Sequence, residues 1–210
     1  MAYDESFDAF AEYVRNRLSR PLPGLDFQLR MAPSHREALD TELARSRPHK
    51  ESAVLILLYP VEGAVSTIYT IRRADLRHHG GQVSFPGGRR NPGEPLSETA
   101  LREAEEEVGI DRAAVDVLGA LTPLFIPPSQ FMVHPFVAVC CRQPTFRAQP
   151  SEVEELLEIE LATLLDPPNR QTEQWEIDGE VSDVPFFAVA GQTIWGATAM
   201  ITNELLEVIR

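Results

Sequence analysis

The spacing of apolar residues separates an N-terminal helical part from a longer mixed part. Between residues 5 and 19 they recur at the spacing of an amphipathic helix: Phe7, Phe10, Ala11, Val14 and Leu18. Pro21 is expected to end this helix. Residues 34–37 have the form of a helix-capping box and predict a second helix to about Arg45. We therefore expect residues 1–49 to form a helical extension that packs on the main domain.

Strand patterns dominate from residue 50 onward. Apolar or alternating runs of strand length occupy residues 52–59, 65–72, 82–85, 115–122, 132–141 and 156–161. A last hairpin is expected around Asp178-Gly179, between residues 174–177 and 185–190. Helical patterns occupy residues 97–108, 162–165 and 196–209, the last of them amphipathic. Since helices and strands interleave without strict alternation, residues 50–210 are predicted to form one α/β domain, a mixed β-sheet sandwiched between helices.

Local residues predict some boundaries within this pattern. The first two strands are expected to form a hairpin across the turn at residues 60–63. Ser97 is the expected N-cap of the helix at 97–108, and Gly109 its C-terminal glycine. Three prolines between residues 123 and 128 predict a stiff loop.

Composition and charge exclude some binding partners and cellular locations. The formal net charge is −13, which argues against nonspecific binding to nucleic acid or to an anionic membrane. Apolar runs fall short of the roughly 18 residues that a membrane span needs, and residues 1–10 lack the apolar core of a secretion signal. Cys140 and Cys141 are adjacent, so in a strand they point to opposite faces and disfavour a mutual disulfide. This suits a reducing compartment, and a cytoplasmic location is expected.

One predicted helix is unusually charged. Residues 102–107 carry five charges in six positions. Glu103, Glu106 and Glu107 stand at i, i+3 and i+4 and therefore project from one helix face, where like charges repel by roughly a few tenths of a kcal/mol per pair. Two interpretations are open from the helix alone. It is a solvated acidic face, or it binds a divalent cation through oxygen ligands.

The surrounding spacing resembles the Nudix box, G-x5-E-x7-R-E-U-x-E-E-x-G-U, in which U is a bulky aliphatic residue. Gly88 is followed after five residues by Glu94, and after seven more by the run REAEEEVGI from Arg102 to Ile110. The one departure is Ala104, where a larger aliphatic residue is usual. The resemblance implies a Nudix fold and a hydrolase of a nucleoside diphosphate linked to another moiety.

The same resemblance assigns roles to the residues of the box. It implies that Mg²⁺ or Mn²⁺ is bound by Glu103, Glu106 and Glu107. Arg102 and Glu94 resemble the pair that fixes the loop against the helix, and the catalytic set is then Glu103, Glu106, Arg102 and Glu94. The catalytic base stays open between Glu103 or Glu106 in the helix and Glu152, Glu154 or Glu155 outside it.

A second stretch just upstream resembles the signature of the coenzyme A diphosphatase branch of this family. The matching residues are Thr70, Arg72, Arg77, Gly81, Phe85, Pro86, Gly87 and Gly88. The departures are Ile68-Tyr69 in place of two leucines, and Arg73 in place of a small residue. The resemblance implies a coenzyme A-like substrate that is split into 3′,5′-ADP and 4′-phosphopantetheine or its derivative. The substrate-binding residues expected here are Arg72, Arg73, Arg77, Gly81, Phe85, Gly87 and Gly88, with arginine guanidinium groups suited to phosphates.

Two alternative functions stay open beside this one. One alternative is a diphosphatase that acts on ADP-ribose or a dinucleotide. The other is a Nudix-fold module that binds a ligand without hydrolysing it. The complete carboxylate set argues against the binding module. Because Nudix domains often dimerise, a homodimer is expected by the same resemblance.

Overall fold

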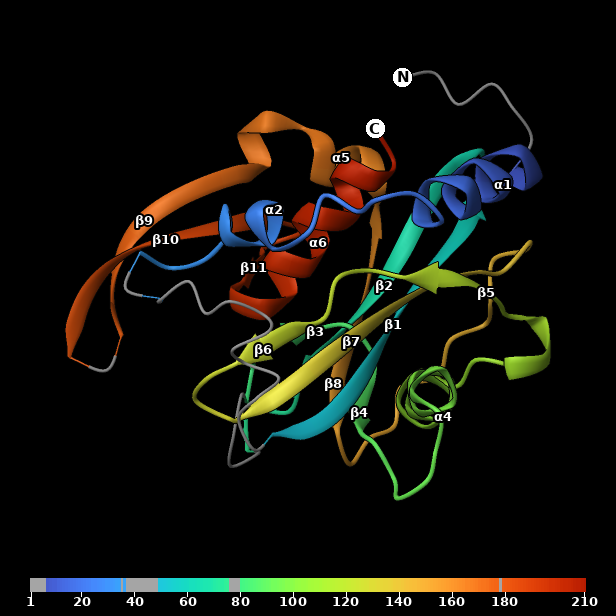
Figure 1. The fold of residues 1–210 in the computed structure, drawn as a ribbon, viewed down its shortest axis with the longest axis horizontal. Coiled ribbons are helices and arrows are strands. Elements are labelled where there is room, and N and C mark those ends of the chain that lie inside the picture. The colour runs from blue at the N-terminus through green and yellow to red at the C-terminus, as the bar shows by residue number, and fades with distance from the viewer. Residues whose placement is uncertain (1–6, 35, 37–48, 76–79, 178) are drawn as a thin grey trace.

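The computed structural model describes residues 7–34, 36, 49–75, 80–177 and 179–210, which form two sheets and several helices (Figure 1). The strands of the main sheet are β1 (Lys50–Val61), β2 (Ala64–Arg72), β3 (Val83–Ser84), β4 (Gly87–Arg89), β5 (Asp116–Ala120), β6 (Leu124–Ile126), β7 (Phe131–Val139) and β8 (Val153–Glu160). The second sheet consists of β9 (Arg170–Ile177), β10 (Glu180–Val189) and β11 (Gln192–Trp195). The α-helices are α1 (Phe7–Leu18), α2 (Leu25–Leu29), α4 (Leu96–Val108), α5 (Leu161–Leu165) and α6 (Gly196–Val208). Two short 3₁₀ helices are η1 (Arg112–Ala114) and η2 (Pro167–Asn169).

The main sheet is mixed, with β1 at its centre. β1 pairs in parallel with β7 and antiparallel with β2, and its first part also pairs antiparallel with β4. β8 pairs with β2 on the far side of the hairpin, and β5 and β6 pair with β7. β4, the strand that contains Gly87 and Gly88, therefore lies directly against the central strand of the sheet.

Alternation along β1 divides the core into two layers. Ile56 and Leu58 belong to the larger cluster, which α1 and α6 also line. Leu55 and Leu57 face the opposite way, into the cluster beneath α4. Figure 1 shows α4 alone on its side of the main sheet and α1 and α6 on the other. The predicted mixed sheet between helices is confirmed, and a strand buried on both faces explains the unbroken apolar run.

Most expected elements occur, including the first hairpin and β8 followed by α5. The loop expected at 123–128 was wrong in part, because β6 forms there and pairs with β7. α4 begins at Leu96 with Pro95 as its N-cap, so Ser97 lies inside the first turn and not at the cap. α6 is buried on nearly all sides and not on one stripe, because β10, β11, α1 and α2 surround it. The strand β11 was not predicted.

The N-terminal segment packs on the same core as the sheet. Phe10 and Val14 of α1 are buried in the larger cluster. Glu204 of α6 is fully buried and accepts hydrogen bonds from the Gly24 amide and from Gln28, which tie α2 and its preceding turn to α6. The helix expected at 34–45 lies largely outside the described residues, and the division between 1–49 and 50–210 stays a prediction.

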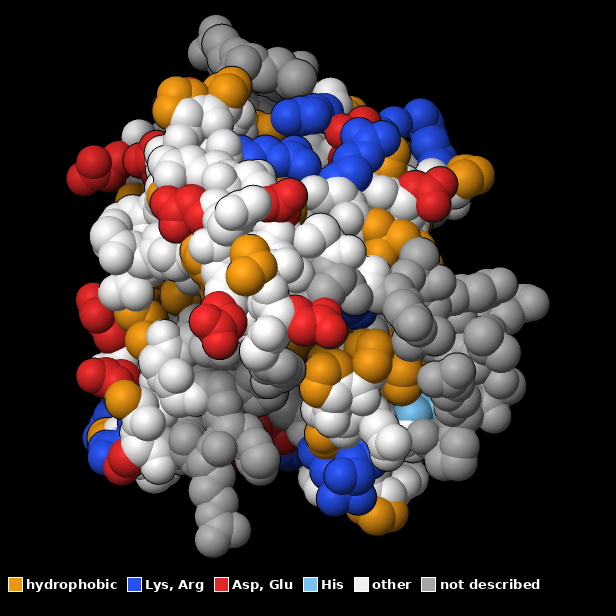
Figure 2. Space-filling model, turned by 90° about the vertical axis from the view of Figure 1, so that its left-hand side faces the viewer, with side chains coloured by type: hydrophobic (Ala, Val, Ile, Leu, Met, Phe, Trp, Pro, Cys, Tyr) orange, Lys and Arg blue, Asp and Glu red, His pale blue; other side chains and the backbone are white. Residues whose placement is uncertain are grey.

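Two expectations from composition can be compared with the fold. Cys140 is buried, Cys141 is exposed, and both are free; the strand expected to contain them, β7, ends before them at Val139. Within the described ranges no helix combines the length and the apolar character that crossing a membrane requires. On the face at the β9–β10 end, Figure 2 shows acidic side chains in separate groups, with basic ones gathered near two edges. The negative charge is therefore not one continuous patch on this face.

Candidate active site

Two glycines of β4 let the sheet approach α4 closely. Gly87 and Gly88 pair with Val54 and Ala53 of β1. A Cβ atom placed on Gly88 would overlap the carboxyl group of Glu103, and one on Gly87 would overlap the carbonyl oxygen of Ala53. Neither glycine has a positive φ, so close approach and not backbone conformation requires them. They form a cradle against which the carboxylates of α4 rest.

Arg102 connects this loop to the carboxylates of its own helix. Its Nε atom lies 2.8 Å from Oε1 of Glu94, and its Nη1 atom lies 2.7 Å from Oε1 of Glu103 and 3.4 Å from Oε2 of Glu106. Glu94 also accepts hydrogen bonds from the Asn91 amide and from Thr99 Oγ1. The hydrogen bond from Arg102 is the main reason that the pKa of Glu94 falls to about 2. Glu94 therefore stays ionised and holds Arg102 in place.

Glu107 is the most deeply buried carboxylate of the helix. It is 3% exposed; its Oε2 atom accepts a 3.1 Å hydrogen bond from the Gly87 amide, and its Oε1 atom lies 3.6 Å from Nη1 of Arg72. Burial raises its pKa to about 7, and the negative charges of Glu103 and Glu152 add to this. Burial of Glu107, more than its neighbours' charges, therefore disfavours its ionised form.

The other two box carboxylates differ in exposure. The side chain of Glu103 is 15% exposed and that of Glu106 is 58% exposed. Burial raises the pKa of Glu103, the hydrogen bond from Arg102 opposes this, and the charges of Glu106 and Glu152 add to the rise. Glu103 and Glu107 thus face inward, while Glu106 stands at the rim of the site.

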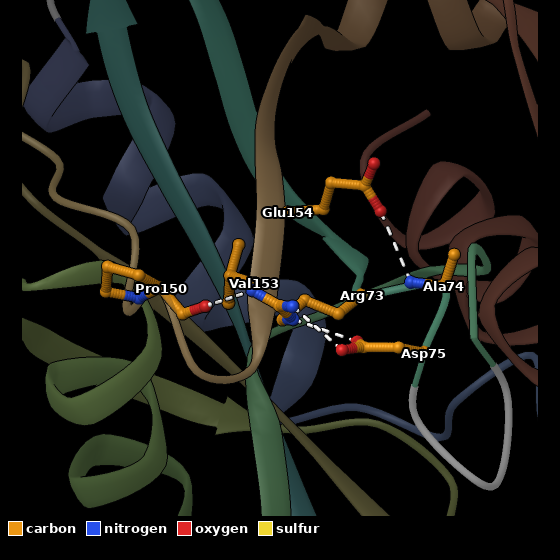
Figure 3. Close-up of a pocket in the computed structure, with 6 residues that line it drawn as sticks. All are labelled: Arg73, Ala74, Asp75, Pro150, Val153 and Glu154. Atoms are coloured by element: carbon orange, nitrogen blue, oxygen red, sulfur yellow. Dashed lines mark hydrogen bonds and ion pairs between the residues drawn. The ribbon is translucent and has the colours of Figure 1, made fainter.

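Glu152 is the outer carboxylate that acts on this cluster. Its charge raises the pKa of both Glu103 and Glu107. Glu154 instead accepts a hydrogen bond from the Ala74 amide, as Figure 3 shows. Glu155 is exposed and pairs with Ile71 across the β2–β8 ladder. Of the three outer candidates for the catalytic base, Glu152 is the one whose charge is felt by both buried carboxylates.

The predicted substrate residues do not all gather here. The Arg73 guanidinium is 2.8 Å from Oδ2 of Asp75 and donates to the carbonyl oxygen of Pro150 at 2.9 Å. Phe85 is 3% exposed and packs on the Tyr69 ring, with centroids 4.6 Å apart, so its side chain belongs to the core. Gly81 has φ +74°, a turn conformation that favours glycine. Arg77 lies outside the described residues.

An open pocket of about 430 Å³ flanks the site. Its lining residues are Arg73, Ala74, Asp75, Pro150, Val153 and Glu154 (Figure 3). None of these six is a residue of the Nudix-like box. The pocket lies where the end of β2 meets the start of β8.

Arg90 is a contact of the loop that the sequence did not reveal. Its Nη1 atom pairs with Glu51 at the start of β1, and its Nε atom donates to the Glu94 carbonyl oxygen at 2.5 Å. The partners are 39 residues apart, so no local pattern could have found the pair. Arg90 fixes the backbone at the residue whose side chain holds Arg102.

The donor set fits a hard divalent cation, although it is not arranged as a finished site. Three carboxylates lie on one helix face, and two of them have pKa values raised by burial. Oxygen donors of this kind suit Mg²⁺ and Mn²⁺. Across the described part of the chain, however, no three His, Cys, Asp or Glu side chains converge as metal ligands. Glu103 and Glu106 are turned toward Arg102.

Comparison with known proteins gives one consistent family. The family model of the NUDIX domain matches residues 49–182. Nudix hydrolase 22, chloroplastic, of Arabidopsis thaliana is 33% identical over 97% of this chain and 67% of its own length. Human mitochondrial coenzyme A diphosphatase NUDT8 is 34% identical over 80% of this chain and 73% of its own length.

Structural similarity gives the same fold. The crystal structure of a Nudix hydrolase from M. smegmatis, RenU, has a TM-score of 0.54 at 20% identity, covering 76% of this chain and 85% of that chain. At that identity the likeness shows the fold alone. The match of the NUDIX family model to more than half of the residues confirms the resemblance seen in residues 88–110. The chain belongs to the Nudix hydrolase family.

Proposed function

We propose that the chain is a metal-dependent hydrolase that splits coenzyme A, or a derivative of it, at the diphosphate. The products are 3′,5′-ADP and 4′-phosphopantetheine or its derivative. The observation that carries the hydrolase is the carboxylate cluster of α4 against the glycine cradle, where Glu103 lies against Gly88 and Glu107 accepts a hydrogen bond from the Gly87 amide. The substrate is supported by the signature ahead of the cradle and by the coenzyme A diphosphatases among the relatives.

Glu103, Glu106 and Glu107 would hold the Mg²⁺ or Mn²⁺. A bound cation of this kind neutralises phosphate charge and lowers the pKa of a coordinated water. Glu94 keeps Arg102 oriented, and Arg102 in turn orients Glu103 and Glu106. Arg72 balances part of the charge on Glu107 at the inner end of the site.

Glu152 is the residue that we assign as the general base, ahead of Glu103 and Glu106 and of Glu154 and Glu155. It accepts a proton from the water that attacks phosphorus. The new P–O bond replaces the bridging P–O bond, whose oxygen leaves on the other phosphate. The support is electrostatic proximity to both buried carboxylates; a base must lie within hydrogen-bond reach of its water.

Arg72 and Arg77 are proposed to meet the phosphates of the substrate. For Arg77 this rests on the signature alone. Arg77→Ala should weaken the use of coenzyme A more than that of its 3′-dephospho form, as steady-state kinetics would measure. Equal losses for the two substrates would remove Arg77 from the 3′-phosphate.

The experiment that tests the function uses the whole chain with coenzyme A, ADP-ribose and NADH in separate incubations with Mg²⁺ or Mn²⁺. Products are identified by mass. Release of 3′,5′-ADP from coenzyme A is expected. Fast cleavage of ADP-ribose without release from coenzyme A would favour the ADP-ribose or dinucleotide diphosphatase, and tight binding without turnover would favour the binding module.

Three further properties belong to the same proposal. We propose residues 1–49 as an extension of a Nudix domain that spans 50–210. We also propose a homodimer, which light scattering after size exclusion would test. A cytoplasmic location stays a prediction; two of the relatives carry chloroplastic and mitochondrial names.

A further inference from the structure

We propose that Arg73 is a positioning residue that holds the turn at residues 149–152, and with it Glu152, against the carboxylate helix. Arg73 was expected to bind substrate phosphates, and its contacts indicate a different role. The inference rests on the proposed function through the role of Glu152. It concerns the one position at which this chain departs in charge from the coenzyme A signature.

The turn that carries Glu152 is anchored at one end to α4. The amide of Glu152 donates to the carbonyl oxygen of Gln149 at 3.1 Å and closes a turn with Pro150 at its second position, where the fixed φ of proline is favourable. The amide of Gln149 donates to the backbone carbonyl of Glu107 at 2.9 Å, and the amide of Arg147 donates to that of Val108. The segment thus satisfies carbonyl groups at the C-terminal end of α4.

Arg73 anchors the other end of the turn in two ways. Its amide donates to the Glu152 carbonyl oxygen at 3.1 Å, and its Nη1 atom donates to the Pro150 carbonyl oxygen at 2.9 Å. The backbone of Arg73 thus contacts the last residue of the turn, and its side chain contacts the second. Glu152 is therefore held between β2 and α4.

Asp75 fixes the direction of the Arg73 side chain. Its Oδ1 and Oδ2 atoms accept hydrogen bonds from Nε at 2.9 Å and from Nη2 at 2.8 Å, which leaves Nη1 aimed at Pro150 (Figure 3). This fork requires the planar guanidinium, and the single ammonium of lysine cannot form it. Three N–H groups of Arg73 are used in this way.

The backbone pairing of β2 with β8 is interrupted close to Arg73. The β2–β8 register shifts between Ile71 and Arg72, so that Ile71 pairs with Glu155 and Arg72 with Val153. A bulge of this kind re-aims side chains and interrupts the ladder. The guanidinium bond to Pro150 supplies a contact just beyond the interruption. Since the Arg73 and Asp75 side chains are 43% and 65% exposed, their ion pair adds little global stability, and its effect is local order.

Hydrogen exchange of the protein alone, without metal or substrate, is the first test. In Arg73→Ala the amides of Glu152 and Val153 should exchange about tenfold faster, while those of the central β1 strand stay unchanged. Arg112→Ala, which removes another partly exposed arginine paired with glutamates of α4, is the matched control and should leave the turn unchanged. Unchanged exchange at Glu152 in Arg73→Ala would overturn the inference.

Kinetics then separate positioning from substrate binding. Arg73→Ala should lower kcat about tenfold and leave KM for coenzyme A within about twofold, because the reacting geometry changes and not the binding of phosphate. In a Glu152→Gln background the same change should cost nothing further, since the two residues act as a unit. A raised KM with normal kcat, or additive losses in the double variant, would overturn the inference.

Two milder variants test the same inference if Arg73→Ala folds poorly. Arg73→Lys and Asp75→Asn should show the same pattern at smaller size, because each loses the fork but not the backbone bond. Failure of the proposed function is distinguishable from failure here. If the chain cleaves none of the diphosphates, the exchange data still decide whether Arg73 holds the turn.

Discussion

The cradle with α4 and the turn at 149–152 bring carboxylates to one place by different means. In the first region most contacts are short in sequence, such as Arg102 with Glu94 eight residues earlier. In the second, the partners of the turn are 77 residues away on β2 at Arg73, or on the end of α4. The pairing of Arg102 with the carboxylates therefore depends on one continuous stretch, although β1 still backs the glycines of the cradle. The turn at 149–152 has its partners only once the sheet is assembled.

The largest effect is expected from the helix itself. Glu106→Gln and Glu103→Gln should each lower kcat by about 10³-fold or more, equivalent to about 4 kcal/mol of transition-state stabilisation, because each removes a charged oxygen ligand and keeps the side-chain shape. Steady-state kinetics with coenzyme A and Mg²⁺ measure this. Glu105→Gln is the matched control, since its carboxylate lies 3.9 Å from Arg112 on another side of the helix. Near-normal turnover in Glu106→Gln would contradict the metal role.

The second region gives the next effect. Glu152→Gln should lower kcat about 10²-fold, within the range of general-base catalysis, whereas Glu154→Gln should cost less than about threefold since its bond to the Ala74 amide can persist. Initial rates with coenzyme A would compare the two variants with the parent. A larger loss of kcat in Glu154→Gln than in Glu152→Gln would identify Glu154, which lines the pocket, as the base.

What could be predicted from the sequence follows the same division. The strand β1 and the helix α4 were expected because apolar spacing and the Nudix-like residues are local signals. The spacing also brought Glu103 and Glu107 to one face. It could not show that Arg73 is paired with Asp75 and Pro150, because the side-chain direction depends on a bulge formed with a distant strand.

Other differences have comparable physical causes. Phe85 matched a substrate signature, yet the fold packs it against Tyr69 in the core. β6 forms inside a proline-rich stretch because its own three residues lie between the prolines and pair with β7. Glu51 gave no local sign of its pairing with Arg90. In each case the missing information was a tertiary partner.

A smaller effect tests the cradle. Gly88→Ala should lower kcat about tenfold with little change in melting temperature, because the new methyl group meets the movable carboxyl end of Glu103 and displaces it from its working position. Gly87→Ala is the contrasting variant. Its methyl group would meet the backbone of Ala53, so it should cost about 2 kcal/mol of stability. Equal melting temperatures for the two variants would contradict this division.

The last effect is on stability alone and concerns Glu107. Folding raises its pKa from 4.5 to about 7, so between these values the folded state binds more protons than the unfolded state. Stability must then fall as pH rises through this window and stay lowered above pH 7. Glu107→Gln keeps an acceptor for the Gly87 amide and carries no charge. Without metal it should be more stable than the parent above pH 7, by on the order of 2 kcal/mol, and nearly equal to it below pH 4.5.

Thermal melts at pH 4 and pH 8 measure this difference, expected to be about 4–8 °C at the higher pH. Adding Mg²⁺ at pH 8 should stabilise the parent more than Glu107→Gln, because binding to the folded state alone raises its melting temperature. Glu105→Gln should show neither change. If Glu107→Gln melted below the parent at pH 8 without metal, the charge of Glu107 would be stabilising. The inner end of the site would then already be neutralised by Arg72, and the electrostatic reason for a cation there would be lost.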